Sequence, residues 1–137
     1  MAKLQTTRSA MPETSKQIVT KFLKAMEQSD YASALQLVAP DCDYINPPPF
    51  GAVKGPAGIR AVLEPFFAPV LENRFELKRV ASDGDAVFVE RLDRHRLENK
   101  WVELPVTGVF EVRNGLIVYW RDYFDVATIM SEWPPMA

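Results

Sequence analysis

A carboxylate lies on the apolar face of the last predicted strand. Alternation along Leu116–Asp125 places Asp122 on one face together with Val118, Trp120 and Phe124. An ionised carboxylate in an apolar setting costs several kcal/mol unless it is paired or hydrogen-bonded, so this position needs an explanation. A functional carboxylate in a pocket is one explanation, and a strand-end residue that reaches water is the other.

A cation and a second carboxylate lie two residues apart on an earlier predicted strand, 86–97. Alternation puts Arg91 and Asp93 on one face with Val87 and Val89, and the opposite face carries three charges, which weakly favours an inward position for the pair. On one face they can hydrogen-bond each other and lie across from a carboxylate of another strand. The alternative, which the pattern alone favours, is a solvated surface ion pair worth ~0–1 kcal/mol.

A neutral pair, Tyr44 and Asn46, lies at the end of a short predicted strand, Cys42–Asn46. Because the two residues are two apart, they face the same side of the strand. A phenol hydroxyl and a carboxamide can hold a water molecule or a substrate oxygen. The pattern alone slightly prefers a core aromatic with a satisfied hydroxyl, followed by a turn residue before Pro47–Pro49.

The scarcity of histidine and cysteine excludes several kinds of chemistry. One His and one Cys among 137 residues leave no internal disulfide, no Cys-cluster metal site and no multi-His metal centre. His95 lies between Arg94 and Arg96, and we expect it to be a surface residue. The sequence contains no nucleophile elbow, phosphate-binding loop, dinucleotide fingerprint or zincin motif. If the protein is an enzyme, carboxylates must carry most of its proton chemistry.

The composition describes one soluble globular domain. Hydrophobic residues make up 47% of the chain and charged residues 25%, with 16 Lys+Arg against 18 Asp+Glu. The near-zero net charge argues against a nucleic acid or a membrane surface as a partner. We expect residues 1–12 to be a flexible N-terminal tail and residues 13–137 to form the single domain. Because no apolar run has the length of a signal sequence or a membrane span, we expect a cytoplasmic protein.

Helical and strand periods divide the chain into two parts that must position these residues. Helical spacing predicts helices from Thr14 or Ser15 to about Ser29, from Tyr31 to about Val38, and from Gly55 to about Leu63. Pro65 and Pro69 make a continuation of the third helix doubtful. From Arg74 the period changes to two, which predicts an antiparallel meander with strands near 74–81, 86–97, 101–113 and 116–125, then a short helix to about Glu132. The fold class is α+β, with the helices covering one face of the sheet.

Several of these segments resemble the limonene-1,2-epoxide hydrolase family. The resemblance is carried by Val89–Asp93, Gly108–Val112, Trp120–Asp125, and Tyr44–Asn46 with the proline-rich loop that follows. It covers the chain from about residue 15 to 130. It implies the NTF2-like cone, in which a curved mixed β-sheet and N-terminal helices enclose a pocket, and it implies a homodimer.

The resemblance also implies a mechanism. Carried over residue by residue, it makes Asp122 the general base on a water molecule that Tyr44 and Asn46 also hold. Asp93 becomes the general acid that protonates the epoxide oxygen, and Arg91 bridges the two carboxylates. Epoxide opening needs a nucleophile at carbon and a proton at oxygen at nearly the same moment, so one carboxylate must be ionised and the other protonated. Water attacks directly, so the reaction needs no covalent ester, no cofactor and no metal.

The expected substrates are a small apolar epoxide and water. Strand parity and helix faces predict an apolar pocket wall, formed by Phe50, Leu63, Phe66, Leu71, Val106, Phe110, Trp120 and Phe124. Two other functions stay open: an isomerase or cyclase of the same cone fold with a single carboxylate base, and a non-catalytic binding module whose charged residues form only a structural network. Arg91 discriminates against the first, because a proton-shuttling isomerase has no need of a cation between two carboxylates.

Overall fold

The helices and strands follow the predicted order. The computed structural model describes residues 13–135, so the tail predicted at residues 1–12 lies outside the described residues. The elements are α2 (Ser15–Glu27), α3 (Tyr31–Leu35), β1 (Val38–Ile45), β2 (Ala52–Lys54), α4 (Gly55–Phe67), β3 (Glu72–Asp83), β4 (Ala86–Arg96), β5 (Trp101–Arg113), β6 (Leu116–Phe124) and α5 (Val126–Glu132).

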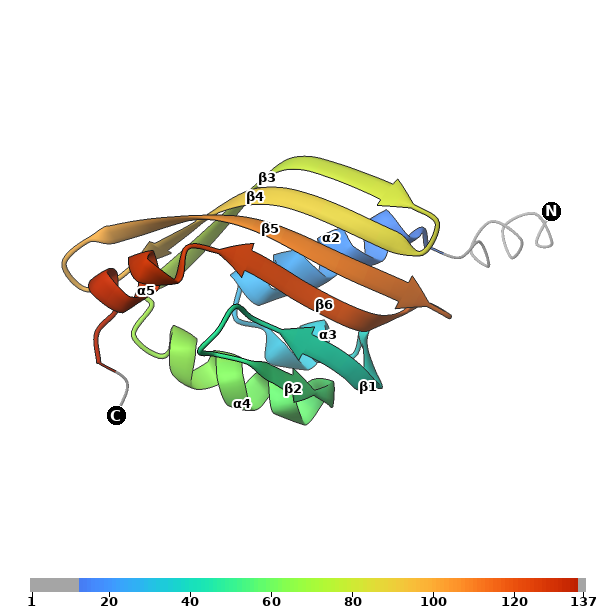
Figure 1. Cartoon of the computed structure of the whole chain (residues 1–137), viewed down its shortest axis with the longest axis horizontal. Coiled ribbons are helices and arrows are strands. Elements are labelled where there is room, and N and C mark those ends of the chain that lie inside the picture. Colours follow the sequence, from blue (N-terminus) through green and yellow to red (C-terminus); the bar gives the residue numbers. More distant parts are fainter. Residues whose placement is uncertain (1–12, 136–137) are drawn as a thin grey trace, which may run out of the picture.

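The sheet has six strands in the order β2-β1-β6-β5-β4-β3. The four-strand meander is confirmed, because β3, β4, β5 and β6 pair antiparallel in sequence order. β1 joins the meander in parallel on β6, which makes the sheet mixed. The sheet curves over α2, α3 and α4, which all lie against its concave side (Figure 1). Side chains that point to this side from the strands therefore face the helices.

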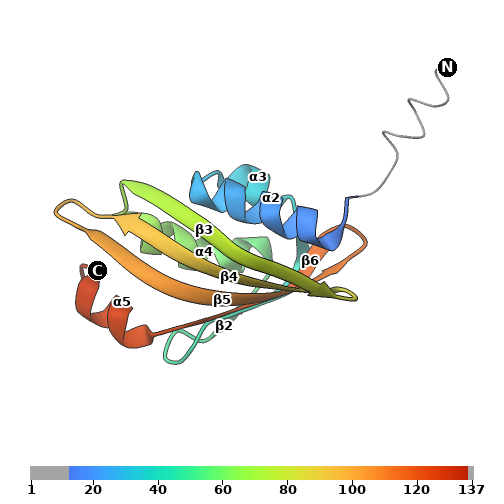
Figure 2. The same cartoon turned by 90° about the horizontal axis from the view of Figure 1, so that it is seen from above.

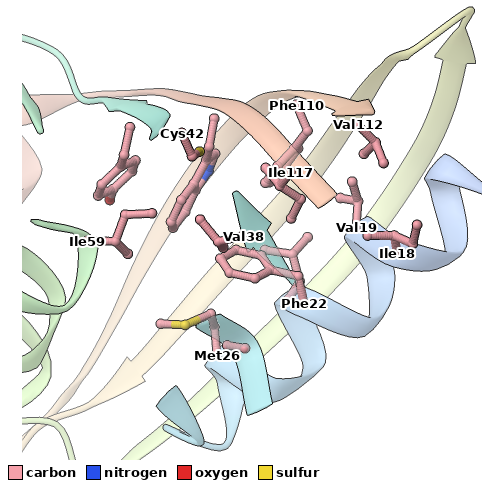
Figure 3. Close-up of a cluster of buried hydrophobic side chains, with 14 of the residues drawn as sticks. Ile18, Val19, Phe22, Met26, Val38, Cys42, Ile59, Phe110, Val112 and Ile117 are labelled. Atoms are coloured by element: carbon pink, nitrogen blue, oxygen red, sulfur yellow. The ribbon is translucent and has the colours of Figure 1, made fainter. Parts of the chain in front are cut away.

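Helix α2 closes one end of the concave side (Figure 2). Its first turn is fixed by a capping box, in which the Thr14 hydroxyl accepts a hydrogen bond from the Gln17 backbone N–H and the Gln17 carboxamide accepts one from the Thr14 N–H. The helix buries one stripe at 3.6-residue spacing, made of Ile18, Val19, Phe22, Leu23 and Met26. That stripe packs on apolar residues of β1, β5 and β6 to form the main core (Figure 3).

The structure differs from the prediction around β1. The helix expected to reach Val38 ends at Leu35, and β1 begins at Val38 instead of Cys42. The reason is pairing with β6, since the Ile117 N–H donates to the Leu37 carbonyl at 2.8 Å and Val38 lies opposite Ile117. Short β2 was missed, and it pairs with β1 to close the proline-rich loop as a hairpin.

Helix α4 continues through Pro65 to Phe67, where the sequence made a continuation doubtful. Pro65 lies in the last turn, so its missing N–H removes only one hydrogen bond near the helix end. The extension also brings the Phe66 ring onto the Trp133 ring, with centroids 4.4 Å apart and planes 2° from parallel. Aromatic packing at the end of the helix outweighs the local cost of the proline.

A second, smaller core lies beneath α5. It consists of Leu97, Val102, Leu104, Val106, Ile129 and Trp133. The main core and this second core both contribute residues to the wall of one cavity on the concave side of the sheet.

Within residues 13–135, no helix is long and apolar enough to cross a membrane.

Candidate active site

The cavity and its open mouth together span about 690 Å³. Six of the predicted wall residues line it: Phe50, Leu63, Phe66, Val106, Trp120 and Phe124. Further apolar residues that sequence reasoning did not name complete the wall, namely Leu23, Met26, Val62, Phe67, Phe75, Leu104 and Ile129. This lining suits a small, mostly apolar ligand.

Two predicted wall residues lie elsewhere. Leu71 precedes β3 and is 59% exposed, because its segment is held to the strand edge by a backbone hydrogen bond to Arg96 and not by packing toward the helices. Phe110 is fully buried and does face the helices, but it packs between Phe22 and Trp120, so it belongs to the main core behind the cavity wall. Strand parity predicted the correct face of the sheet for Phe110, but it could not predict how deeply the side chain is buried on that face.

The charged residues meet at the cavity. The Nε atom of Arg91 donates a hydrogen bond to Asp93 Oδ1 at 2.9 Å. Its other two nitrogens donate to Asp122, Nη2 to Oδ2 at 2.8 Å and Nη1 to Oδ1 at 3.3 Å. The three residues are 4%, 5% and 6% exposed, in the order Arg91, Asp93, Asp122. The prediction of a solvated surface ion pair, which the pattern alone favoured for Arg91 and Asp93, is therefore wrong. The alternative that Asp122 reaches water at the end of its strand is wrong as well.

The two carboxylates differ in their hydrogen bonding. Asp122 accepts three N–H groups, because Trp120 Nε1 donates to its Oδ1 at 2.8 Å in addition to the two Arg91 bonds. Asp93 accepts one, from Arg91 Nε, and its Oδ2 makes no hydrogen bond within residues 13–135. An ionised carboxylate is an acceptor only, whereas a protonated one also needs somewhere to donate. The asymmetry suits an ionised Asp122 and an Asp93 that carries a proton.

Burial raises the pKa of Asp93 to about 6, although the positive charge of Arg91 and its hydrogen bond act in the opposite direction. Burial also works against the charge of Arg91, but the negative charges of Asp122 and then Asp93 outweigh it and raise the pKa of Arg91 above its usual value. Arg91 is therefore a permanent cation between the carboxylates. Asp93 titrates close to the physiological range.

Gly108 allows Arg91 to reach Asp122, and sequence reasoning did not assign it a role. Strand β5 separates β4 from β6, and on it Gly108 lies opposite both Val89 and Asp122. A Cβ atom at Gly108 would lie 2.8 Å from Arg91 Nη1 and 2.9 Å from Asp122 Oδ1. Glycine inside a strand often marks such a close approach, so the signal was present in the sequence.

The neutral pair reaches the same cavity from β1. Tyr44 lies opposite Trp120 in the parallel pairing with β6, and the two rings stack with centroids 3.9 Å apart. Burial, and then the negative charge of Asp122, raise the pKa of the Tyr44 hydroxyl, so it stays a hydrogen-bond donor. Asn46 also lines the cavity. The structure thus brings all five predicted polar residues to one cavity, with Trp120 as an additional donor.

His95 is the clearest error of the sequence analysis. It is 2% exposed and lines the cavity, where a surface position was expected. The charged neighbours Arg94 and Arg96 suggested that His95 faces solvent. They point to the other face of β4, because successive side chains along a strand point to opposite faces.

Within residues 13–135, no three His, Cys, Asp or Glu side chains come together in a way that could hold a metal ion.

Comparison with known proteins agrees with this geometry. The family model described as the limonene-1,2-epoxide hydrolase catalytic domain matches residues 13–135. The chain belongs to the limonene-1,2-epoxide hydrolase family. Epoxide hydrolase EphG of Mycobacterium tuberculosis is 36% identical over 110 residues, which cover 79% of this chain and 71% of that protein.

Solved structures place this member of the limonene-1,2-epoxide hydrolase family within the NTF2-like fold. An LEH-like epoxide hydrolase from M. tuberculosis superposes with a TM-score of 0.73 at 31% identity, covering 85% of this chain and 86% of that one. A putative SnoaL-like polyketide cyclase from Shewanella putrefaciens gives a TM-score of 0.75 at 18% identity, covering 96% and 92% of the two chains. The second likeness is one of fold alone. The predicted NTF2-like α+β fold is confirmed.

Proposed function

We propose that this member of the limonene-1,2-epoxide hydrolase family adds water to a small apolar epoxide and releases a vicinal diol. Family membership and the relatives named as epoxide hydrolases support the substrate class. The wall of the cavity supports the apolar character, because aromatic and aliphatic side chains make up most of it.

One observation carries the mechanism: the Arg91 guanidinium lies between two buried carboxylates, at 2.9 Å from Asp93 and 2.8 Å from Asp122. Asp122, which accepts three N–H groups, is the general base that takes a proton from water. Tyr44 and Asn46 hold that water from the β1 side. A single-carboxylate isomerase would not need the cation, so this arrangement favours a paired acid and base.

The step is balanced in atoms and protons. As Asp122 removes one proton from water, the water oxygen bonds to a ring carbon and the carbon–oxygen bond of the epoxide breaks. Asp93 gives its proton to the epoxide oxygen, which becomes the second hydroxyl of the diol. Each turnover leaves Asp122 protonated and Asp93 ionised. Before the next turnover, Asp122 must lose its proton and Asp93 must gain one. No bond forms between the substrate and the protein.

A panel of cyclic and aliphatic epoxides tests the proposal, with the diols identified by mass. We expect the wild type to form diol from at least one member, and Asp122→Asn and Asp93→Asn to lose that activity. Glu103→Gln is the matched control, because Glu103 accepts a hydrogen bond from an arginine on the exposed face of the same sheet. A wild type that leaves every epoxide unchanged, or an Asp122→Asn variant as active as the wild type, would contradict the proposal.

We also infer a homodimer, as the family resemblance implies. The outer face of the sheet exposes the large apolar side chains Phe88 and Tyr123, which an interface would cover. Light scattering coupled to size exclusion would give twice the mass of the chain for a dimer, and the mass of one chain would contradict it.

A further inference from the structure

His95 is a buried polar group that the proposed mechanism does not use. It follows Arg91 and Asp93 on the same face of β4, so strand geometry puts it roughly 7 Å along the strand from Asp93. His95 is one of the residues that line the cavity. The concave face of β4 therefore presents a third polar group to a ligand, beyond the acid and the guanidinium.

The contact with Asn73 fixes which ring nitrogen carries the proton. Asn73 lies opposite His95 on β3, and its Oδ1 atom is 2.6 Å from His95 Nδ1. A carboxamide oxygen only accepts hydrogen bonds, so Nδ1 donates and Nε2 keeps its lone pair. Burial, and then the positive charge of Arg91, lower the pKa of His95 to about 4, so the ring is neutral near pH 7.

The lone pair at Nε2 has no partner in the described part of the chain. Among residues 13–135, Nε2 of His95 is the one side-chain nitrogen or oxygen that is fully shielded from solvent and makes no hydrogen bond. Its neighbours are the rings of Phe66, Phe67, Phe75 and Trp133, with centroids 5.0 to 6.4 Å from the imidazole. The single N–H group among these rings, Trp133 Nε1, already donates to the Phe66 carbonyl at 3.0 Å. A buried acceptor without a donor is unfavourable, so a ligand that brings a donor there gains affinity.

We propose that His95 Nε2 accepts a hydrogen bond from a substrate hydroxyl that lies several carbon atoms away from the epoxide ring. This inference rests on the proposed function and narrows its substrate class to epoxy alcohols: an epoxide at Asp93, an apolar middle against the aromatic rings, and a hydroxyl at His95. A site with an unpaired buried acceptor discriminates against an analogue that lacks the donor. We expect kcat/KM to favour the alcohol over its methyl ether by about tenfold or more.

The first test is direct observation of the ring. The chain contains one His, so both imidazole nitrogen resonances of the 15N-labelled protein, prepared without a histidine tag, belong to His95. Their couplings to the ring protons tell Nδ1 from Nε2. The Asp122→Asn variant is titrated with epoxy alcohols of increasing chain length and with their methyl ethers, which keep the oxygen but cannot donate. We expect a protonated Nδ1 and a bare Nε2 whose resonance moves upfield with an alcohol of matching length and not with its ether. A protonated Nε2, or equal shifts with alcohol and ether, would overturn the proposal.

The second test is a specificity ratio, in which general damage to the enzyme cancels. His95→Phe keeps the ring and removes both nitrogens, and the double variant Asn73→Leu with His95→Phe also removes the carboxamide that would be left without its partner. In both variants we expect the alcohol-to-ether ratio of kcat/KM to fall to about one. A ratio that stays at the wild-type value would overturn the proposal. If the wild type opens no epoxide at all, the proposed function fails, while the titration still decides whether His95 accepts a hydroxyl.

Discussion

Strand β4 carries two arginines that each lie between two carboxylates, on opposite faces of the same sheet. On the outer face, Arg94 donates to Glu103 at 3.0 Å and to Glu76 at 2.9 Å. On the inner face, Arg91 donates to Asp93 at 2.9 Å and to Asp122 at 2.8 Å. The side chain of Arg94 is 33% exposed and that of Arg91 is 4% exposed. The hydrogen-bonding pattern is almost the same, and the surroundings differ.

The difference shows that burial, and not the pattern of charges, turns such a cluster into a candidate for catalysis. Water around Arg94 weakens each of its ion pairs, and exposed pairs contribute about 0–1 kcal/mol. Arg91 and its two carboxylates are shielded from bulk solvent. Burial therefore raises the pKa of Asp93 to about 6, and two chemically identical carboxylates can hold different protonation states. The two clusters are thus matched controls for each other.

The largest contrast is expected in activity. Asp122→Asn removes the general base and keeps the size of the side chain, and it should lower kcat by about 10²–10⁴-fold. Glu103→Gln makes the same chemical change beside Arg94, and it should leave kcat within about twofold of the wild type. Initial rates of diol formation measure both. Equal effects of the two substitutions would show that the inner cluster is only structural.

The next contrast is in stability. Arg91→Gln leaves two buried carboxylates without their cation and should lower the free energy of unfolding by about 3–5 kcal/mol. Arg94→Gln breaks two exposed ion pairs and should cost about 0–1 kcal/mol. Urea unfolding followed by tryptophan fluorescence gives both values. An Arg91→Gln variant as stable as Arg94→Gln would mean that the inner carboxylates do not depend on the guanidinium.

The geometry between the strands can be broken without touching a charge. Gly108→Ala places a Cβ atom 2.8 Å from Arg91 Nη1, so the guanidinium must move away from Asp122. We expect a loss of about 1–3 kcal/mol in stability, together with at least a tenfold lower kcat/KM, since a small displacement of a catalytic group is costly. Thr107→Ala on the exposed face of β5 is the control and should change neither. A fully active Gly108→Ala variant would exclude a need for the Arg91–Asp122 contact.

The smallest contrast is in the dependence on pH. The general acid must be protonated, and Asp93 loses its proton as the pH rises through about 6, so kcat/KM should fall above that pH by roughly tenfold per unit. Arg94→Gln should leave the profile in place, because Arg94 lies on the other face. A wild-type profile that stays flat from pH 5 to 8 would contradict the role of Asp93.

The sequence predicted the strands of the meander and the face that carries Arg91, Asp93 and Asp122, because alternation is a local property. It could not predict the depth of a side chain on that face, and so Phe110 was expected in the cavity wall. The predicted surface position of His95 was wrong for a related reason. Its neighbours in sequence are charged, while its neighbours in space are aromatic rings.

Interactions between distant segments were also beyond local patterns. The parallel pairing of β1 with β6 sets Tyr44 on Trp120, and it depends on where the chain returns after two helices. The need for glycine at position 108 arises from two residues on different strands, Arg91 and Asp122. A glycine in a strand interior indicates that another group comes close to the backbone there, but it does not indicate which group.

A single turnover in heavy-oxygen water shows whether water attacks the epoxide directly. With enzyme in excess over epoxide, we expect the first diol formed to carry one oxygen from the solvent, and the Asp122 carboxylate, analysed by peptide mass, to carry none. A first diol without the label, together with heavy oxygen in Asp122, would mean that a covalent ester to Asp122 forms and would exclude direct attack.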